Sequence, residues 1–226
     1  MNFKMRYFTV FISFLLLMSC ATSKKIVERP ITFNEERNQL TLEYLSSRYG
    51  LEQESPFITP KMIVLHWTEI PNLQKSFEAF YNPKLPDFRS EIKSSSGLNV
   101  SSQFLVDQDG TIYRLMDETT MARHVIGLNH CAIGIENVGG TAQTPLTKEQ
   151  IIANIWLVKY LSKKYGIEYL IGHYEYTNFE GHELWLEKDD AYRTKKTDPG
   201  ADFLNAVKKG TKKFKFKPTP APLKHI

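Results

Sequence analysis

Cysteine is scarce in this chain, which carries two, Cys20 and Cys131, among 226 residues. So few thiols exclude a disulfide-stapled scaffold, because at most one bridge can form. The apolar run over residues 131–135 predicts a core strand. We therefore expect Cys131 to be a small buried apolar residue and not a reactive thiol, since nothing around it indicates a lowered pKa.

A long hydrophobic run is also lacking. Residues 7–18 are almost wholly apolar, but they are fewer than the roughly 20 residues that span a membrane. Lys4 and Arg6 precede this run and supply a charged start. The pattern predicts a secretory signal peptide over residues 1–19.

The string Leu-Met-Ser-Cys at residues 17–20 resembles a bacterial lipobox, in which the cysteine is lipidated and begins the mature chain. We therefore predict a lipid anchor on Cys20 that holds the protein to a bacterial membrane in the cell envelope, facing the periplasm or the exterior. With Cys20 lipidated, Cys131 has no intramolecular partner. The alternative is an ordinary signal peptide with an incidental cysteine.

Neither charge sign dominates, because 29 lysines and arginines face 25 acidic residues and give a net charge of +4. The distribution is uneven, since residues 208–226 hold seven lysines and the region before them is mildly acidic. We predict that residues 208–226 form a basic, proline-rich tail that is solvated and disordered. This tail suits anionic wall polymer or lipid head groups, whereas nucleic acid is not expected as a partner of an exported protein.

No internal repeat is present, and the roughly 180 residues between the signal and the tail suffice for one sizeable core. We predict a tether over residues 20–30 and one domain over residues 31–207, and we expect a monomer. The domain begins with a helix over residues 34–49, since Asn34 offers an N-cap and Gly50 a C-terminal stop.

Strand and helix patterns alternate along this domain. Apolar runs predict strands at residues 61–66, 104–106, 111–115, 132–136 and 167–171. Residues 107–110 end in glycine and predict a hairpin between the second and third of these strands. Helical spacing predicts helices after the first strand, after a capping box at residues 147–150, and around residues 203–207. The fold class is therefore α/β, a single domain with a central mixed sheet flanked by helices.

The compact zinc motif His-Glu-x-x-His is absent. Instead, two apolar strands each end in a histidine, His66 and His173, and Asp198 follows downstream. Because buried strands hold their end residues on rigid backbone, these side chains predict a catalytic Zn²⁺ site with the fourth position left to water. A lone strand-end histidine is otherwise a packed or hydrogen-bonded residue. His182 is a further candidate ligand on composition alone.

Six short strings follow one another over one domain, at residues 63–68, 100–113, 122–129, 132–136, 171–173 and 196–200. Together they resemble the zinc-dependent N-acetylmuramoyl-L-alanine amidases of type 2, whose fold is shared with peptidoglycan recognition proteins and some phage lysozymes. The resemblance runs from about residue 61 to residue 203. It implies an enzyme that hydrolyses the amide between N-acetylmuramic acid and L-alanine in peptidoglycan or muropeptides, for cell-wall turnover or recycling.

The resemblance also implies roles for individual residues. His66, His173 and Asp198 would hold the zinc ion. Glu136 would be the acid/base residue, with the pKa of its carboxyl raised toward neutrality by partial burial; without the resemblance, it reads equally as a salt-bridged carboxylate. Lys196 would be the cation beside the scissile carbonyl, and in an extended segment its side chain points the same way as that of Asp198.

Three further residues are candidate substrate contacts. His124 and Asn129 lie on a loop before the strand of Glu136 and are predicted to bind the sugar or the peptide. For His124, a position behind the metal ligands is the alternative. Trp67 directly follows His66 and is predicted to be a groove wall or a core aromatic.

Three features depart from the family pattern. The stretch after His173 is longer than usual, and residues 174–195 are predicted to form either a groove wall or lid, or a surface loop. Gln103 stands where members often have histidine, and Ser102 where some phage enzymes place a catalytic tyrosine. Catalysis would then depend more heavily on Glu136.

Two other classes of function compete with hydrolysis. A muropeptide-binding module of the same fold needs no turnover, but the presence of all three candidate ligands and both helper residues disfavours it. A structural wall tether would use only the anchor and the basic tail, and it leaves the polar strand-end residues without a role. We therefore predict an amidase, with a non-catalytic peptidoglycan-binding lipoprotein as the alternative.

Overall fold

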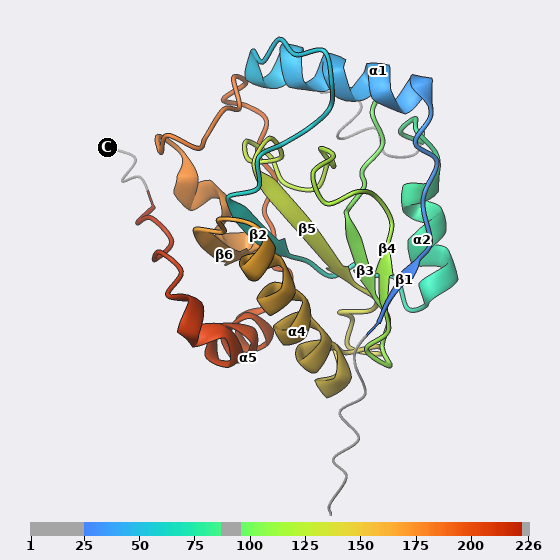
Figure 1. The fold of residues 1–226 in the computed structure, drawn as a ribbon, viewed down its shortest axis with the longest axis vertical. Coiled ribbons are helices and arrows are strands. Elements are labelled where there is room, and N and C mark those ends of the chain that lie inside the picture. The colour runs from blue at the N-terminus through green and yellow to red at the C-terminus, as the bar shows by residue number, and fades with distance from the viewer. Residues whose placement is uncertain (1–24, 87–95, 223–226) are drawn as a thin grey trace, which may run out of the picture.

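Six strands form one sheet in the order β1-β4-β3-β5-β2-β6 in the computed structural model, which describes residues 25–86 and 96–222 (Figure 1). The strands are β1 (Ile26–Glu28), β2 (Met62–Leu65), β3 (Phe104–Val106), β4 (Ile112–Arg114), β5 (Ala132–Asn137) and β6 (Tyr169–Gly172). All neighbours are parallel except β3 and β4, which form the predicted hairpin with Gly110 at a φ of 80°. The mixed sheet with flanking helices confirms the predicted fold class.

The α-helices among the described residues are α1 (Glu35–Tyr44), α2 (Leu73–Tyr81), α4 (Lys148–Lys164) and α5 (Ala201–Thr211). α1 begins at the N-cap Asn34 and continues into the π-helical turn η1 (Leu45–Tyr49), which ends at Gly50 with a φ of 68°. α4 begins with the capping box at residues 147–150. Short side-chain signals therefore set where these helices begin and end.

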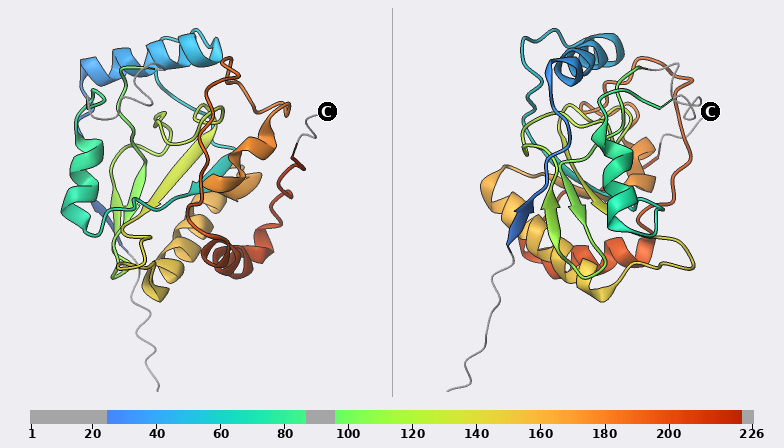
Figure 2. Two further views of the ribbon diagram at one scale, coloured as in Figure 1. Left: turned by 180° about the vertical axis from the view of Figure 1, so that it is seen from behind. Right: turned by 90° about the vertical axis from the view of Figure 1, so that its right-hand side faces the viewer.

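The two faces of the sheet are covered differently, because side chains alternate along each strand. In β2, Ile63 and Leu65 point into the core that α4 and α5 cover, whereas Met62 and Val64 belong to the opposite face. Figure 2 shows α4 on one side of the sheet and α2 on the other. His66, the next residue after β2, therefore emerges on the face opposite α4.

Residues 174–195 cover part of this second face. Their buried side chains Tyr176, Phe179 and Leu184 form one hydrophobic cluster with Ile171 of β6. The segment begins with the 3-10 turn η2 (His173–Phe179), which directly follows β6. It is thus packed on the sheet and is not an isolated surface loop.

The same segment is bound to the N-terminal helical region. Arg48 Nη2 in η1 lies 2.7 Å from Glu187 Oε1, and the Glu187 side chain is fully buried. The Arg48 guanidinium also lies over the ring of Tyr192, at 4.7 Å from its centroid. A backbone hydrogen bond from Lys188 N to Arg48 O, at 3.1 Å, completes the link.

At the N-terminal end, the structure differs from the expected tether over residues 20–30. Residues 26–28 form β1, which pairs in parallel with β4 and is an edge strand of the sheet. This strand was not predicted, because a three-residue edge strand among polar residues carries little hydrophobic pattern. The predicted signal peptide and Cys20 lie outside the described residues.

The C-terminal end also differs from the expected disordered tail over residues 208–226. α5 runs on to Thr211, and Phe216 packs against the core beneath α4 and α5. Lys217 N donates a hydrogen bond to Glu168 O at 2.8 Å, just before the edge strand β6. The lysine content predicts disorder, but Phe216, which lies between lysines, anchors the segment to the core.

Cys131 is 3% exposed, and burial raises the pKa of its thiol to about 12. This confirms the prediction of a buried, unreactive residue. Within the described ranges, no helix combines the length and the apolar character that a bilayer crossing requires.

Candidate active site

The candidate site lies at the carboxyl ends of three neighbouring parallel strands, where β2 and β6 end and β5 continues for two more residues. β2 pairs with β5 and β6, and its last residue is in register with Ile135 on one side and Gly172 on the other. The next residue along each chain segment is Glu136 in β5, His66 after β2 and His173 after β6. Parallel pairing therefore brings together side chains that are far apart in the sequence.

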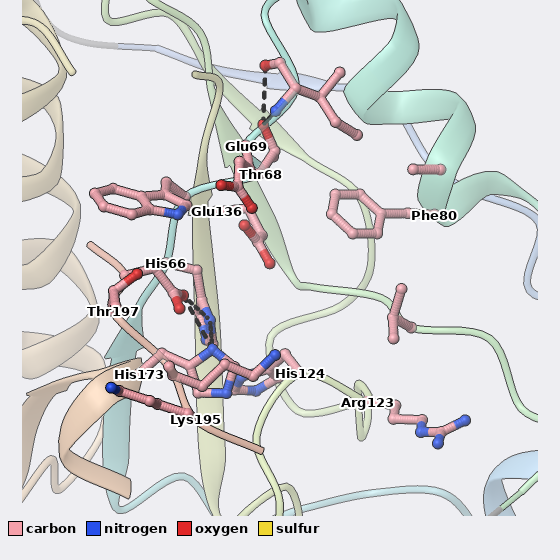
Figure 3. Close-up of a pocket in the computed structure, with 16 residues that line it drawn as sticks. His66, Thr68, Glu69, Phe80, Arg123, His124, Glu136, His173, Lys195 and Thr197 are labelled. Carbon is pink, nitrogen blue, oxygen red and sulfur yellow. Dashed lines mark hydrogen bonds and ion pairs between the residues drawn. The ribbon is translucent and has the colours of Figure 1, made fainter. Parts of the chain in front are cut away.

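Three candidate ligand atoms converge at this edge of the sheet. His66 Nδ1 lies 3.0 Å from His173 Nδ1 and 3.2 Å from Asp198 Oδ2. His173 Nδ1 lies 3.0 Å from the same carboxylate oxygen, and all three residues are buried. Figure 3 shows the imidazoles of His66 and His173 meeting in one cavity.

This geometry fits a tetrahedral zinc ion. Zinc–ligand bonds of about 2.0–2.1 Å place the ligand atoms roughly 3.3 Å apart, close to the separations seen here. Two imidazoles and one carboxylate also leave a fourth position for water, which is the pattern of hydrolytic zinc sites. The residues predicted as ligands are therefore brought together in a donor set that suits the metal.

The protonation of the cluster suits a metal as well. Burial opposes ionisation of Asp198, but its hydrogen bonds with His173 and His66 outweigh burial and hold the pKa of this carboxyl well below its usual range. Burial, aided by the neighbouring His66, lowers the pKa of His173 to about 4. The site thus offers a carboxylate and a neutral imidazole, which are the forms that bind metals.

His124 lies directly behind His66. His66 Nε2 is 3.0 Å from His124 Nδ1, and His124 Nε2 is 3.3 Å from the carbonyl oxygen of Ala132. Burial and the adjacent His66 lower the pKa of His124 well below its usual value, so its ring is neutral. With His66 Nδ1 facing the ligand cluster, His66 Nε2–H donates to His124, which donates in turn to Ala132. His124 therefore lies behind the candidate metal ligands, which is the second of the two positions considered for it.

Asn129 does not line the main cavity over the ligand cluster, but it lines the narrower cavity beside it. It is fully buried, and its Oδ1 accepts hydrogen bonds from the backbone N–H groups of His124, at 2.9 Å, and Val125, at 2.8 Å. Its Nδ2 donates to the Tyr49 hydroxyl at 2.9 Å. These bonds fix the loop that carries His124, and its role as a substrate contact stays a prediction.

Glu136 and Lys196 both line a cavity of about 300 Å³ that opens over the ligand cluster. Glu136 is 9% exposed, which is the partial burial that an acid/base role requires. Figure 3 shows its side chain in the same cavity as His66. The charge of Lys196 contributes to the low pKa of His173, so the ammonium acts on this cluster.

Gln103 and Ser102 brace the strand that carries Glu136. Gln103 Oε1 accepts a hydrogen bond from Gly134 N at 2.7 Å, and Ser102 Oγ donates to Gly134 O at 2.8 Å. Both residues are fully buried. Neither is therefore available to substrate, which agrees with the greater weight that the sequence places on Glu136.

Other cavity walls had no signal in the sequence. Glu69 lies at the rim with a φ of 57°, a left-handed conformation that is uncommon outside glycine. Thr68 Oγ1 accepts hydrogen bonds from Ser76 Oγ at 3.1 Å and from Gly139 N at 3.3 Å, and so holds this turn. The remaining unexpected lining residues are Ile70, Ala79, Phe80, Val100, Arg123, Lys195 and Thr197.

The 174–195 segment contributes to a narrower neighbouring cavity of about 70 Å³. Tyr192 and Thr194 line it together with His124 and Lys196, which also line the main cavity. The segment is therefore a wall of the groove, as one of the two predicted alternatives states.

Trp67 and His182, two further candidates from the sequence, lie in different parts of the structure. Trp67 lines the main cavity and is partly buried, which makes it a groove wall. His182 Nε2 lies 3.2 Å from the Tyr169 hydroxyl and does not belong to the ligand cluster.

Known proteins show the same architecture. Among solved structures, N-acetylmuramoyl-L-alanine amidase LysC from Clostridium intestinale URNW has 24% sequence identity and a TM-score of 0.52, over 85% of this chain and 99% of that chain. The endolysin N-acetylmuramoyl-L-alanine amidase LysCS from the same organism has 23% identity and a TM-score of 0.51, over 85% of this chain and 97% of that one. These likenesses show a shared fold, and no curated protein sequence matches the chain.

A family model is more specific than the fold. The model described as N-acetylmuramoyl-L-alanine amidase, Amidase_2, matches residues 56–201. This range holds all three candidate ligands, Glu136 and Lys196. Because the match covers more than half of the sequence, the chain belongs to the Amidase_2 family of N-acetylmuramoyl-L-alanine amidases.

Proposed function

We propose that this protein is a zinc-dependent N-acetylmuramoyl-L-alanine amidase that hydrolyses the amide between N-acetylmuramic acid and L-alanine in peptidoglycan or its fragments. The observation that carries the proposal is the convergence of His66 Nδ1, His173 Nδ1 and Asp198 Oδ2 within 3.0–3.2 Å. Family membership supports the reaction class. The buried cluster lines an open cavity, which supports the binding of a substrate next to the metal ligands.

His66, His173 and Asp198 would hold the zinc ion. When bound there, zinc polarises a carbonyl and lowers the pKa of a water ligand from about 15.7 to about 7. His124 keeps the imidazole of His66 in the tautomer and orientation that present Nδ1 to the metal. The buried carboxylate of Asp198 offsets part of the positive charge.

Glu136 and Lys196 would act on the substrate itself. Glu136 accepts the proton of the attacking water and passes it to the departing amine, which converts the amine into a good leaving group. Lys196 places its ammonium beside the scissile carbonyl, where negative charge develops in the transition state. A module that only binds muropeptides has no use for this acid/base residue within the metal cavity.

Mass spectrometry of a muropeptide digest tests the reaction. The purified protein should release intact peptides that begin with L-alanine, and it should do so only with zinc present. Glu136→Gln should bind the same muropeptides without cleaving them. Binding without cleavage by the wild-type protein would favour the non-catalytic alternative.

We also propose that a lipid on Cys20 holds the protein to a membrane of the cell envelope. The lipobox-like string at residues 17–20 supports this, and β1 begins only a few residues later. Cys20→Ser should move the protein from membrane fractions to the soluble fraction. A variant that still requires detergent for extraction would contradict the anchor.

A further inference from the structure

Beyond their first turns, α4 and α5 carry positive charge without negative charge. Residues 152–164 of α4, and residues 205–214 of α5 and the following 3-10 turn η3 (Lys212–Phe214), contain seven lysines and no aspartate or glutamate. Two of the seven pair with acidic side chains, Lys164 with Glu118 and Lys208 with Glu175. The other five form no ion pair with a residue that the structure describes: Lys159, Lys163, Lys209, Lys212 and Lys213. Their charges are therefore available to an anionic partner.

The two helices lie side by side on one face of the sheet, as Figure 1 shows. Both pack on the same core cluster, which includes Leu157 of α4 and Leu204 of α5. A Cβ atom placed on Gly210 would lie 2.4 Å from Ile155 Cδ1, so the last turn of α5 touches α4 directly. The lysines of the two helices therefore belong to one basic region of the surface.

Apolar and aromatic side chains lie among the lysines of α4. Ile152 is 57% exposed, and the rings of Trp156 and Tyr160 stack with an interplanar angle of 2°. The two rings line a hollow of about 400 Å³ together with three lysines of α4. Spacing by four residues places Ile152, Trp156 and Tyr160 along one stripe of the helix. We call these three residues and the five lysines without an ion pair the α4–α5 surface.

The first strand of the domain lies beside this surface. Ile26 of β1 packs against the core cluster that α4 covers. Arg114 Nη1 lies 2.8 Å from Glu28 Oε1 at the end of β1, and Arg114 Nη2 lies 2.9 Å from Glu118 Oε1. The hydroxyl of Tyr160 donates to the same Glu118 oxygen at 3.1 Å. A chain of polar contacts thus links β1 to the aromatic stack on α4.

The chain that precedes β1 is short. Five residues lie between Cys20 and Ile26, and even a fully extended segment of this length spans at most roughly 20 Å. A lipid on Cys20 would therefore hold β1, and α4 beside it, close to the membrane. Tryptophan and tyrosine favour the interface between water and acyl chains, and lysine is attracted to anionic head groups. The chemistry of the α4–α5 surface thus matches the partner that the anchor would bring to it.

On the basis of the proposed anchor at Cys20, we propose that the α4–α5 surface docks on an anionic phospholipid bilayer. The lysines contact the head groups, and Ile152, Trp156 and Tyr160 lie at the boundary with the acyl chains. The contact is reversible and orients the anchored protein, so it does not replace the lipid. Because His66 emerges on the face opposite α4, docking leaves the cavity over the metal ligands turned away from the bilayer. A soluble anionic polymer fits the lysines but has no use for an exposed isoleucine beside an aromatic stack.

Co-sedimentation with vesicles tests the docking. The parent is the full-length protein with Cys20→Ser, because a lipid would mask the contribution of the surface. It should bind vesicles of phosphatidylglycerol and phosphatidylcholine at least about 10-fold more tightly than vesicles of phosphatidylcholine alone. Lys159→Gln combined with Lys163→Gln should lower the partition coefficient for the mixed vesicles about 10- to 30-fold, since one lysine near an anionic surface contributes about 5-fold. Ile152→Gln should lower it about 3- to 10-fold.

A second pair of lysines provides the matched control. Lys75→Gln combined with Lys188→Gln removes the same charge from exposed positions on α2 and in the 174–195 segment. It should leave the partition coefficient within about 2-fold of the parent, because salt screens charges that lie far from the bilayer. Equal binding to both kinds of vesicle, or equal losses in the two double variants, would overturn the docking.

Two further outcomes separate the docking from its alternatives. Binding to soluble polyphosphate without binding to vesicles would assign the surface to an anionic polymer and overturn the proposal. Mass spectrometry of the wild-type protein shows independently whether Cys20 carries a lipid. Vesicle binding as expected, together with an unmodified Cys20, would contradict the anchor and support the docking surface.

Discussion

His66 Nε2 lies 3.0 Å from His124 Nδ1, so the imidazole that is predicted to bind metal is held by a second imidazole behind it. The neutral ring of His124 accepts a hydrogen bond from His66 Nε2–H at its Nδ1 and donates one from its Nε2–H to the carbonyl oxygen of Ala132. The pair thus explains how a residue at the end of β2 presents one particular nitrogen to the metal site.

Loss of this support should weaken metal binding. We expect His124→Leu, which keeps bulk but removes the acceptor, to reduce zinc affinity about 10- to 100-fold. Competition with a chromogenic chelator measures this affinity. His182→Leu is the control, because His182 is a partly buried histidine outside the cluster. Unchanged zinc affinity in His124→Leu would show that the second imidazole does not position His66.

Asn129 should matter for stability as well as for activity. Asn129→Ala leaves the buried N–H groups of His124 and Val125 without their acceptor, which should cost about 1–3 kcal/mol in the free energy of unfolding. Urea denaturation measures the loss. Asn205→Ala, at an exposed position on α5, should change the stability little. A direct substrate contact would instead raise KM and leave the denaturation midpoint unchanged.

Glu118 should make stability depend on pH. Burial opposes its ionisation, but hydrogen bonds from Lys164, at 2.6 Å, and Tyr165, at 2.7 Å, hold its pKa below the usual 4.5. Its charge therefore stabilises the folded state above pH 4.5, and this contribution is lost as the pH falls through the lower folded pKa.

Glu118→Gln should accordingly reduce the free energy of unfolding at pH 7 by about 1–3 kcal/mol. The difference between wild type and variant should stay constant down to about pH 5 and shrink at lower pH. Denaturant titrations at several pH values measure it. A difference that grows on acidification would contradict the assigned sign.

Substitution of Phe216 tests whether the C-terminal segment is ordered or disordered. Its ring packs partly buried against the core under α4 and α5, so Phe216→Ala should lower the free energy of unfolding by about 1–2 kcal/mol. Lys215→Ala, at the exposed neighbouring position, should have little effect. Equal stability of both variants and the wild type would contradict an ordered segment and support the disordered tail that the lysine content predicts.

The sequence predicts the central strands and the alternation of strands and helices along the domain. It also predicts the candidate ligands His66, His173 and Asp198. Each of these predictions depends on a local pattern in the sequence. Apolar runs that end in His66 and His173 predict buried strands, and the parallel pairing of β2 with β6 then brings the two histidines together. The role of Asn129 was not predictable, because its partners Tyr44 and Tyr49 are about 80 residues away in the chain. The φ of 57° at Glu69 likewise depends on tertiary packing.

Zinc content per chain, measured in parallel with muropeptide amide hydrolysis, tests the proposed metal centre most directly. We expect about one zinc ion in the wild-type protein and in Glu136→Gln, with turnover at least 100-fold lower in the variant. Asp198→Ala should lose both the metal and the activity, and chelation followed by added zinc should abolish and restore wild-type turnover. Full hydrolysis by zinc-free protein, or by Asp198→Ala, would contradict the metal centre.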